Sequence, residues 1–287
     1  MQASAATSDP SPDPSGGAAG SPAPAGDKAV AIIPARFAST RFPGKMLAAE
    51  TGRPLVQHVV DRVRQCRLVS EVLVAADDQR IADALVPFGT KVILTSPDHP
   101  SGTDRVAEVA VAMSADIVVN VQGDEPEIEP ASVDALVRLL RDRPAAEMAT
   151  LATPFPPDAD PADPNLVKVV VAPDGRALYF SRSPIPYDRD AGRPGRCLLH
   201  MGVYGYRRNF LLKLAGYGPT PLETTEKLEQ LRVLEYGHTI LVAVVDRRSH
   251  GVDTPQQYAE FVKREKARGA PPSPSGFAAE TGMPSVT

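Results

Sequence analysis

The chain of 287 residues has a formal net charge of -4 and a sequence pI near 5.8, so it offers no broad basic surface for a nucleic acid or an anionic membrane. Its two cysteines stand far apart and outside any C-x-x-C spacing, which argues against a disulfide framework or a zinc site and favours the reducing cytoplasm. No run approaches the roughly 18 to 20 apolar residues that span a bilayer. We therefore expect a soluble protein that is long enough for one large α/β domain.

Both ends of the chain differ in composition from its middle. Residues 1–27 are almost all Ala, Pro, Ser and Gly, and residues 270–287 have the same character. Such segments bury too little apolar surface to offset the entropy lost on ordering, so both are predicted to be disordered. No Lys or Arg precedes Lys28 and no continuous apolar run follows the start, which argues against a signal peptide. A single domain is predicted over residues 28–269.

Short apolar runs alternate with helical periodicity in the first half of the domain, a pattern typical of β-α units in a mostly parallel sheet. In chain order, strands are predicted at Ala29–Pro34, Val72–Ala76, Lys91–Thr95 and Asp116–Val121. Helices are predicted over residues 55–63, where five apolar residues share one face, and over Thr103–Met113.

After Met148 the pattern becomes β-rich. Strands are predicted at Met148–Thr153, Val167–Ala172, Ala177–Ser181 and Met201–Tyr206, followed by a helix at Glu223–Tyr236, a strand at Ile240–Asp246 and a helix that opens at Thr254 and Pro255. The predicted fold is α/β, with a mixed, mostly parallel sheet and a smaller β-rich part at about 148–210.

The segment that follows the first predicted strand suits a polyphosphate. Residues 36–45 hold three cations, two hydroxyls and a glycine at the carboxyl end of a strand, where open α/β sheets bind ligands. It is not a Walker loop, because Ser39 stands in place of the first glycine and Met46 in place of the Ser or Thr after the lysine. No G-x-G-x-x-G turn supports a dinucleotide dehydrogenase. The same charges would also fit an ordinary solvated loop.

Two aspartates are candidate metal ligands, because each lies just past a predicted strand. Mg²⁺ prefers oxygen ligands and commonly takes one or two carboxylates together with phosphate oxygens and water. Asp124 alternatively forms a turn in its Gly-Asp-Glu-Pro context, and Asp253 alternatively caps the helix that starts at Thr254.

A family resemblance rests on motifs that occur in a fixed order. Residues 33–45, IPARFASTRFPGK, resemble the opening signature of the CMP-sugar synthetases. The later motifs are HPSGTDR (99–105), VNVQGDEP (119–126), YFSR (179–182), HMGVY (200–204), EKLEQLR (226–232) and GVDTP (251–255). Together they are similar to the 3-deoxy-manno-octulosonate (Kdo) cytidylyltransferases, the CMP-Kdo synthetases, over about Ala29 to Lys266.

The resemblance implies a Rossmann-like nucleotidyltransferase fold and magnesium-dependent joining of CTP to Kdo, which yields CMP-Kdo and diphosphate. The product is expected to serve lipopolysaccharide or related glycoconjugate synthesis. A cytoplasmic homodimer is implied as well, with the β-rich part near the sugar site and the dimer contact.

The family motifs also imply roles for individual residues. The catalytic set is Lys45, Arg36, Asp124 and Asp253, of which the two aspartates bind Mg²⁺. The nucleotide-binding set is Ala35, Arg36, Ser39, Arg41, Lys45, Asp77, Ser101, Arg105 and Gln122. The sugar-binding set is Arg182, His200, Tyr204, Glu229 and Gln230. Taken singly, each sugar-site residue has an ordinary alternative as a surface cation, a core histidine, a strand aromatic or part of a solvated helix face.

Two positions depart from the family pattern. Ala76 stands where a Thr is frequent, which removes one possible hydroxyl contact to the base. Glu127 replaces the usual apolar residue, and we expect only a local change in packing there.

Two other functions remain as alternatives. The chain could activate another acidic 2-keto sugar, such as 8-amino-Kdo or a sialic acid, although the EKLEQLR motif favours Kdo over sialic acid. It could also be an inactive nucleotide-binding protein, since a fold alone does not establish activity. The presence of Lys45, Asp124 and Asp253 argues against this second alternative.

Overall fold

The computed structural model describes residues 27–189 and 197–268. The strands are β1 (Ala29–Ala35), β2 (Glu71–Ala76), β3 (Lys91–Leu94), β4 (Ile117–Asn120), β5 (Met148–Pro154), β6 (Lys168–Val171), β7 (Ala177–Ser181), β8 (Leu198–Arg207) and β9 (Ile240–Val244). The α-helices are α1 (Leu55–Val63), α2 (Gln79–Leu85), α3 (Gly102–Val111), α4 (Pro130–Asp142), α5 (Arg208–Leu214), α6 (Pro221–Glu226), α7 (Gln230–Glu235) and α8 (Pro255–Arg268). Two short 3₁₀ helices are η1 (Lys45–Leu47) and η2 (Val86–Phe88).

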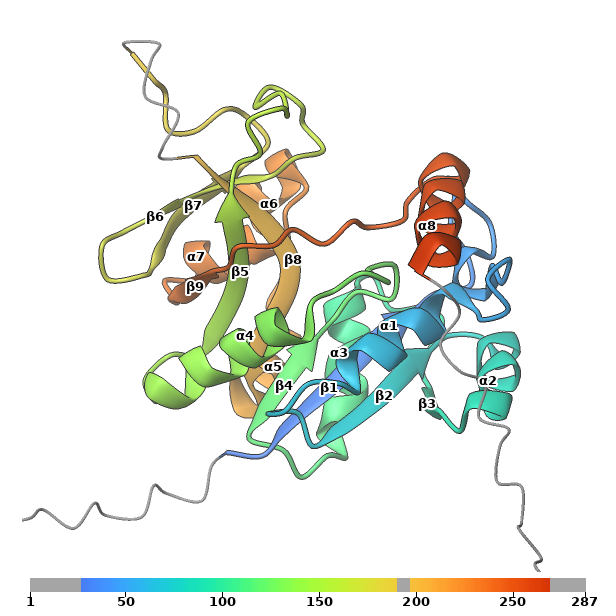
Figure 1. Ribbon diagram of the computed structural model, residues 1–287. Coiled ribbons are helices and arrows are strands. Elements are labelled where there is room, and N and C mark those ends of the chain that lie inside the picture. Colours follow the sequence, from blue (N-terminus) through green and yellow to red (C-terminus); the bar gives the residue numbers. More distant parts are fainter. Residues whose placement is uncertain (1–26, 190–196, 269–287) are drawn as a thin grey trace, which may run out of the picture.

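In the described residues, all of these strands join one mixed sheet (Figure 1). The order along its main path is β3-β2-β1-β4-β8-β5-β9, and β6 pairs with β7 and β8. Strands β1 to β4 pair in parallel, β8 runs antiparallel to both β4 and β5, and β9 pairs in parallel with β5. The predicted mixed α/β sheet is confirmed.

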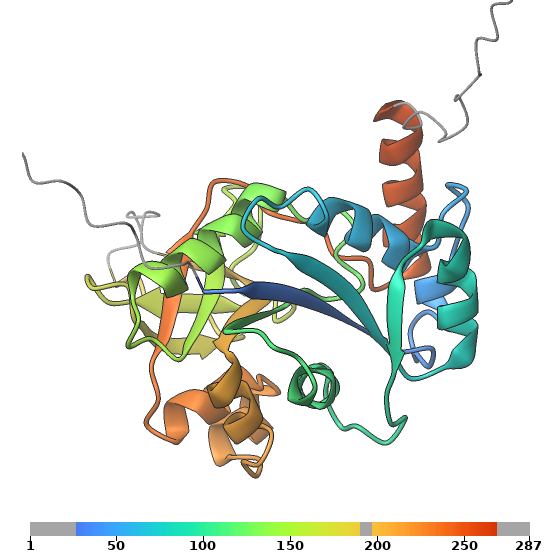
Figure 2. The same ribbon diagram turned by 90° about the horizontal axis from the view of Figure 1, so that it is seen from below.

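Helices cover both faces of the sheet (Figure 2). Ala31 and Ile33 of β1 belong to the core that contains the apolar sides of α1 and α4, whereas Val30 and Ile32 belong to the core with α3 and α5. Because alternate side chains of a strand point to opposite faces, a strand buried on both sides must be apolar at every position, as β1 is.

The strand order reverses at β1, and this reversal locates a crevice. The chain passes from β1 to β2 and β3 on one side and then returns to β4 on the other side. The loops that leave β1 and β4 therefore diverge from neighbouring strand ends. Open α/β sheets bind ligands in such crevices at the carboxyl ends of the strands.

The helix predicted over residues 223–236 is wrong as a single element. Helix α6 ends at Glu226, and Lys227 adopts a left-handed conformation with φ of 55° before α7 begins. The Arg182 guanidinium holds this break, because its Nε donates to the Glu226 carbonyl at 2.7 Å and its Nη2 to the Lys227 carbonyl at 3.2 Å.

The remaining differences between the predicted and the observed fold concern omitted helices and the start of one strand. The sequence reasoning omits α2, α4 and α5, and β8 begins three residues before the predicted strand at Met201. Of the two segments predicted to be disordered, all but Asp27 lie outside the described residues. Within the described ranges, no helix is both long enough and apolar enough to cross a membrane.

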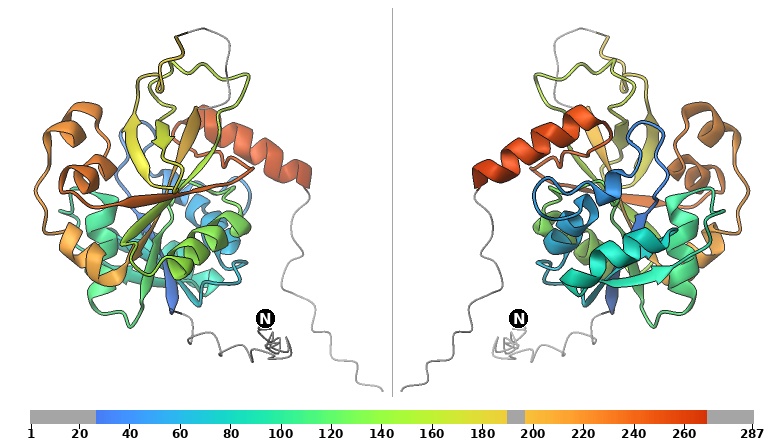
Figure 3. Two further views of the ribbon diagram at one scale, coloured as in Figure 1. Left: turned by 90° about the vertical axis from the view of Figure 1, so that its left-hand side faces the viewer. Right: turned by 90° about the vertical axis from the view of Figure 1, so that its right-hand side faces the viewer.

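Helix α8 packs far from the strand that precedes it. The segment after β9 crosses the molecule (Figure 1), and α8 lies beside α1 on the side opposite to α6 and α7 (Figure 3). Tyr258, Phe261 and Val262 of α8 form a small core with Leu55. The N-terminus of α8 thereby reaches the loop that leaves β1.

Glu127 ties α8 to the body of the protein, so the expectation of a purely local packing change is wrong. Its carboxylate is almost buried and lies 2.7 Å from the guanidinium nitrogens of both Arg264 and Arg268. Burial opposes the charged carboxylate, but the hydrogen bonds from the two arginines outweigh burial and lower the pKa of Glu127. The acidic residue is thus a long-range clamp for α8.

We expect Glu127→Gln to lower the free energy of unfolding by about 1–2 kcal/mol at neutral pH, because the charge-assisted hydrogen bonds from the two arginines are lost and the half-exposed arginines regain water. Since the folded pKa of Glu127 is depressed, its contribution is present at neutral pH and disappears as the pH falls through that pKa. The difference between variant and wild type in urea unfolding should therefore shrink as the pH falls below the ordinary Glu pKa of about 4.3, and vanish below the depressed pKa of Glu127.

Glu260→Gln is the matched control, because Glu260 lies on the same helix, is exposed and only approaches Arg264 at 4.0 Å. It should change stability by less than about 0.5 kcal/mol. Equal effects of the two substitutions would contradict the clamp.

Candidate active site

Three adjoining cavities open at the carboxyl ends of β1 and β4. The loop cavity, of about 500 Å³, lies between residues 36–45, the start of α3 and the loop after β4. The inner cavity, of about 460 Å³, lies over β8 and α7 and shares Gln122 with the loop cavity. The outer cavity, of about 570 Å³, shares Tyr204 with the inner cavity and Asp253 with the loop cavity. Because they share lining residues, we describe the three together as the cleft.

Gly123 brings the loop after β4 against the end of β1. A Cβ atom at this position would stand 2.8 Å from the Pro34 carbonyl oxygen and 3.1 Å from Met46 Sδ, so any larger residue would push the loops apart. The close approach places Asp124, the next residue, beside Lys45 of η1.

The Lys45 ammonium lies between the two predicted carboxylates. Its Nζ is 2.6 Å from Asp124 Oδ2, 3.1 Å from Asp253 Oδ1 and 3.1 Å from the Val252 carbonyl oxygen. Burial opposes its charge, but the two carboxylates outweigh burial and raise the pKa of Lys45. Arg41 adds a second cation at 3.0 Å from Asp253. Residues from three distant parts of the chain thus meet at one charged centre.

The same centre fits a magnesium ion. The two carboxylates already converge on one small cation, and a neighbouring carbonyl oxygen faces the same point. Within the described ranges, no group of three or more His, Cys, Asp or Glu could hold a metal. Any ion here would complete its shell with water or ligand oxygens, as Mg²⁺ commonly does with phosphates.

The loop cavity also meets the N-terminus of α3. Ser101 caps this helix and, with Gly102, lines the cavity beside Arg36 and Ser39. The first N–H groups of a helix and its dipole favour an anion at this end. The cavity therefore offers backbone donors as well as cations.

Three residues of the predicted nucleotide set lie behind the cavity wall rather than on it. Ala35 and Arg105 are fully buried, and Asp77 accepts a hydrogen bond of 2.8 Å from the Phe37 N–H. Arg105 Nη2 is 3.6 Å from Asp77 Oδ2 and, like Nε, has no hydrogen-bond partner among the described residues. This pair stabilises the start of the loop and leaves buried donors available.

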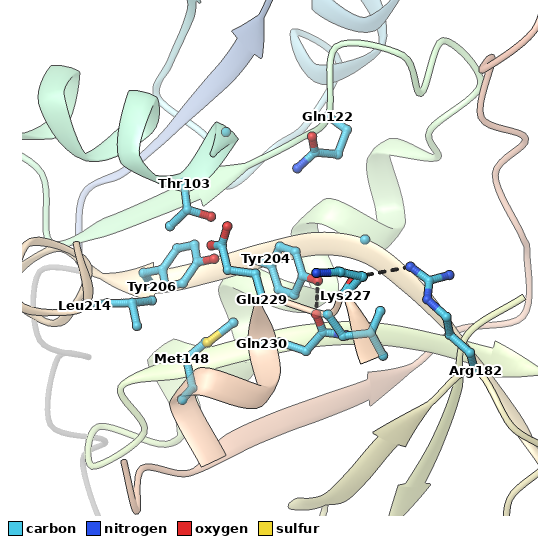
Figure 4. Close-up of a pocket in the computed structure, with 14 residues that line it drawn as sticks. Thr103, Gln122, Met148, Arg182, Tyr204, Tyr206, Leu214, Lys227, Glu229 and Gln230 are labelled. Atoms are coloured by element: carbon cyan, nitrogen blue, oxygen red, sulfur yellow. Dashed lines mark hydrogen bonds between the residues drawn. The ribbon is translucent and has the colours of Figure 1, made fainter. Parts of the chain in front are cut away.

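Polar groups from two elements meet in the inner cavity (Figure 4). The Tyr204 hydroxyl donates to Gln230 Oε1 at 3.2 Å, while Gln230 Nε2 is buried without a partner in the described part of the chain. Burial raises the pKa of Glu229, and the neighbouring hydroxyl groups of Thr103 and Ser101 partly oppose this shift. The sequence predicts Glu229 and Gln230 here but misses Thr103, which lies within the HPSGTDR motif.

Arg182 lines the inner cavity, yet its guanidinium mainly holds backbone carbonyls. Besides its bonds to Glu226 and Lys227, its Nη1 donates to the Pro164 carbonyl at 2.7 Å. Lys227, which sequence reasoning did not single out, also lines this cavity. The break between α6 and α7 therefore presents a second cation beside Arg182.

His200, Gly202 and Tyr204 line the outer cavity from one strand, β8. Burial lowers the pKa of His200 to about 3, so its ring is neutral at physiological pH. Gly202 is unusual among the glycines of the described ranges: a Cβ there would meet nothing within 4 Å, and its φ is not positive. Gly202 lines both the inner and the outer cavity, so a side chain here would project into open space where the two adjoin.

Comparisons with known proteins agree with this architecture. A family described as "Cytidylyltransferase" matches residues 30–240. The chain is 52% identical over 246 residues to the 3-deoxy-manno-octulosonate cytidylyltransferase of Geobacter sulfurreducens, a match that covers 82% of this chain and 98% of that protein. It is 46% identical over 240 residues to the protein of the same name from Solibacter usitatus, covering 84% and 95% of the two chains.

Solved structures give the same result. A structure of CMP:2-keto-3-deoxy-manno-octonic acid synthetase complexed with CTP superposes with a TM-score of 0.80 at 45% identity, covering 84% of this chain and 99% of that chain. A glucose-1-phosphate thymidylyltransferase from Bacillus anthracis, described as putative, has a TM-score of 0.60 at 14% identity over 85% and 97% of the two chains and shares the fold alone.

Proposed function

The chain belongs to the 3-deoxy-manno-octulosonate cytidylyltransferase family, and from this premise we propose that Lys45, Asp124 and Asp253 form its magnesium-dependent reaction centre. The enzyme transfers the cytidylyl group of CTP to Kdo and releases diphosphate. The observation that carries the proposal is the cation held between two converging carboxylates at the switch point of the sheet.

The reaction requires charge neutralisation more than a protein nucleophile. A hydroxyl oxygen of the sugar forms a bond to the α-phosphorus of CTP, and the bond from that phosphorus to the bridging oxygen of diphosphate breaks. Magnesium, when bound, offsets phosphate charge and polarises the phosphoryl oxygens. Positioning of the two substrates supplies much of the remaining acceleration.

The residues of the loop cavity suit the triphosphate. Lys45 and Arg41 neutralise the carboxylates in the ligand-free enzyme, so both cations can pair with phosphate oxygens once a metal ion satisfies the carboxylates. Arg36 and Ser39 line the same cavity, and the start of α3 adds N–H donors. Lys45 is then well placed to offset charge on the departing diphosphate.

The inner and outer cavities suit the sugar. Glu229, Gln230 and Tyr204 supply donors and acceptors for hydroxyl groups, and the unpartnered Gln230 Nε2 calls for a ligand acceptor. Cations for the sugar carboxylate are Lys227 and Arg182 in the inner cavity and Arg248 in the outer cavity.

Parallel assays test both the sugar and the metal. Purified protein with CTP and magnesium is offered Kdo, 8-amino-Kdo, N-acetylneuraminic acid or no sugar, and diphosphate release is followed together with the mass of the product. Release with Kdo, abolished by EDTA and restored by magnesium, is the expected result. Preference for another acid would overturn the sugar assignment, and silence with every sugar despite CTP binding would favour an inactive nucleotide-binding protein.

We propose in addition that the enzyme is a homodimer in the cytoplasm. Exposed apolar side chains of Leu178 on β7 and Val244 on β9 support a contact through the β-rich part. CTP is a cytoplasmic metabolite, which supports the compartment. Light scattering should give twice the chain mass, and a monomer would contradict the dimer.

Asp253→Asn is expected to lower kcat on the order of 100-fold, because one charge that holds the metal is removed while the amide keeps the shape. The magnesium concentration at half-maximal rate should rise. Asp83→Asn on the exposed side of α2 is the control and should leave both quantities unchanged. A variant at Asp253 with normal magnesium dependence would exclude this residue as a ligand.

Gly202→Val is expected to raise the KM for Kdo by at least about tenfold, because the new side chain projects into the passage between the inner and outer cavities. The backbone at Gly202 is compatible with a β-branched residue, so stability should be retained. The KM for CTP serves as the internal control. Equal increases in both KM values would show that the fold, not the passage, was damaged.

A further inference from the structure

We propose that Thr150 fixes the tautomer of His200 and so makes Nδ1 of this ring a dedicated hydrogen-bond acceptor for a hydroxyl group of the sugar. Thr150 is then a positioning residue, since it acts through His200. The inference rests on the proposed use of the outer cavity by the sugar, but its first readout does not require any substrate.

Thr150 lies at an irregularity between β5 and β8. Thr150 pairs with Tyr204, but the next residue, Leu151, pairs with Met201, so Gly202 and Val203 stand opposite no residue of β5. Such a bulge interrupts the regular backbone ladder. The Thr150 hydroxyl points at this interruption.

Three polar atoms surround this hydroxyl. Oγ1 lies 2.9 Å from the Val203 carbonyl oxygen, 3.3 Å from the Met201 carbonyl oxygen and 2.9 Å from Nε2 of His200. The Thr150 side chain is fully buried, so water cannot take the place of any of these partners. All hydrogen bonds must therefore be made with the protons that these groups carry.

Only one assignment of donors and acceptors satisfies these groups. A hydroxyl has a single proton, and carbonyl oxygens only accept. If that proton pointed to Nε2, the Thr150 oxygen would face a carbonyl oxygen at 2.9 Å with no proton between them, which is costly in a buried site. The hydroxyl therefore donates to a carbonyl and accepts from Nε2–H of His200.

A neutral ring with its proton on Nε2 has a bare Nδ1. Burial keeps the ring neutral by lowering the pKa of His200 to about 3. Phe180 packs edge-on against the ring at 4.9 Å between centroids, and Tyr204 lies at 5.6 Å, so the ring orientation is fixed. Within the described ranges no protein group donates to Nδ1.

The His200 ring also lines the outer cavity, so the lone pair of Nδ1 determines which ligand groups the ring can bind there. A bare nitrogen accepts a hydrogen bond from a hydroxyl group and repels a carboxylate. His200 therefore recognises a hydroxyl of the sugar, and the carboxylate must be bound by the cations elsewhere in the cleft. Thr150 looks like an ordinary strand residue but decides which part of the substrate His200 can face.

The first test measures the tautomer in wild-type protein. ¹⁵N NMR of histidine-labelled protein, with the ring of His200 assigned through His200→Gln, should show the proton on Nε2 with no sugar present. A proton on Nδ1 would overturn the proposal. Because this measurement needs no catalysis, it remains informative even if the proposed function fails.

The second test uses Thr150→Val, which keeps the β-branched shape and removes the hydroxyl. We expect the Nε2–H preference to be lost and the KM for Kdo to rise about five- to tenfold, as for the loss of one neutral hydrogen bond, while the KM for CTP stays unchanged. Thr150→Ser retains the hydroxyl and should restore both the tautomer and the KM. A changed tautomer with an unchanged KM for Kdo would overturn the role of Nδ1.

Discussion

The attraction between one buried ammonium and two carboxylates organises the cleft. Lys45 sits at the end of the loop that leaves β1, Asp124 follows β4, and Asp253 precedes α8, so the three charges belong to segments that have no local reason to meet. A buried ammonium is tolerated only where opposite charges surround it. The ligand-free protein therefore holds the two carboxylates of the proposed reaction centre together through its own cation.

Two further features make this meeting possible. Gly123 lets the loop after β4 lie against the end of β1 at a distance that any side chain would prevent. Helix α8 is held in place by its small apolar core and by Glu127. Asp253 lies just before this helix, so the position of the helix fixes the position of Asp253. The sheet thus sets the position of two charges and a peripheral helix sets the third.

Much of the fold can be predicted from the sequence because local patterns determine it. The apolar runs of β1 and β4 predict their burial, and the order of motifs predicts that Lys45 lies in the same site as Asp124. Contacts between distant residues are harder to predict from the sequence. No residue near Lys227 in the sequence prevents a continuous helix. The break depends on a contact with the distant guanidinium of Arg182, which local patterns do not predict. Helix α4 is different, because its apolar residues at helical spacing were a readable signal that the prediction omits.

The predictions for the site also succeed for local features and fail for contacts between distant residues. Residue types and motif order predict most of the side chains that line the cleft, but they do not separate these from Ala35, Asp77 and Arg105 behind its wall, nor do they predict what each residue does. Arg182 lines the inner cavity, where it was expected to bind the sugar, and its donors also support a turn of backbone that the sequence did not predict. The proton on His200 depends on a hydroxyl across an irregular strand pair, which no periodicity in the sequence can reveal.

The long connection between β9 and α8 also has a consequence for biosynthesis. All strands of the sheet are complete once the ribosome has passed Val244, but the second carboxylate and the helix that fixes it are still to be made. The strands that carry the ends of the cleft are therefore made before Asp253. The sheet can form around Lys45 and Asp124 first, and Asp253 joins these two charges when the segment that carries it folds back across the molecule.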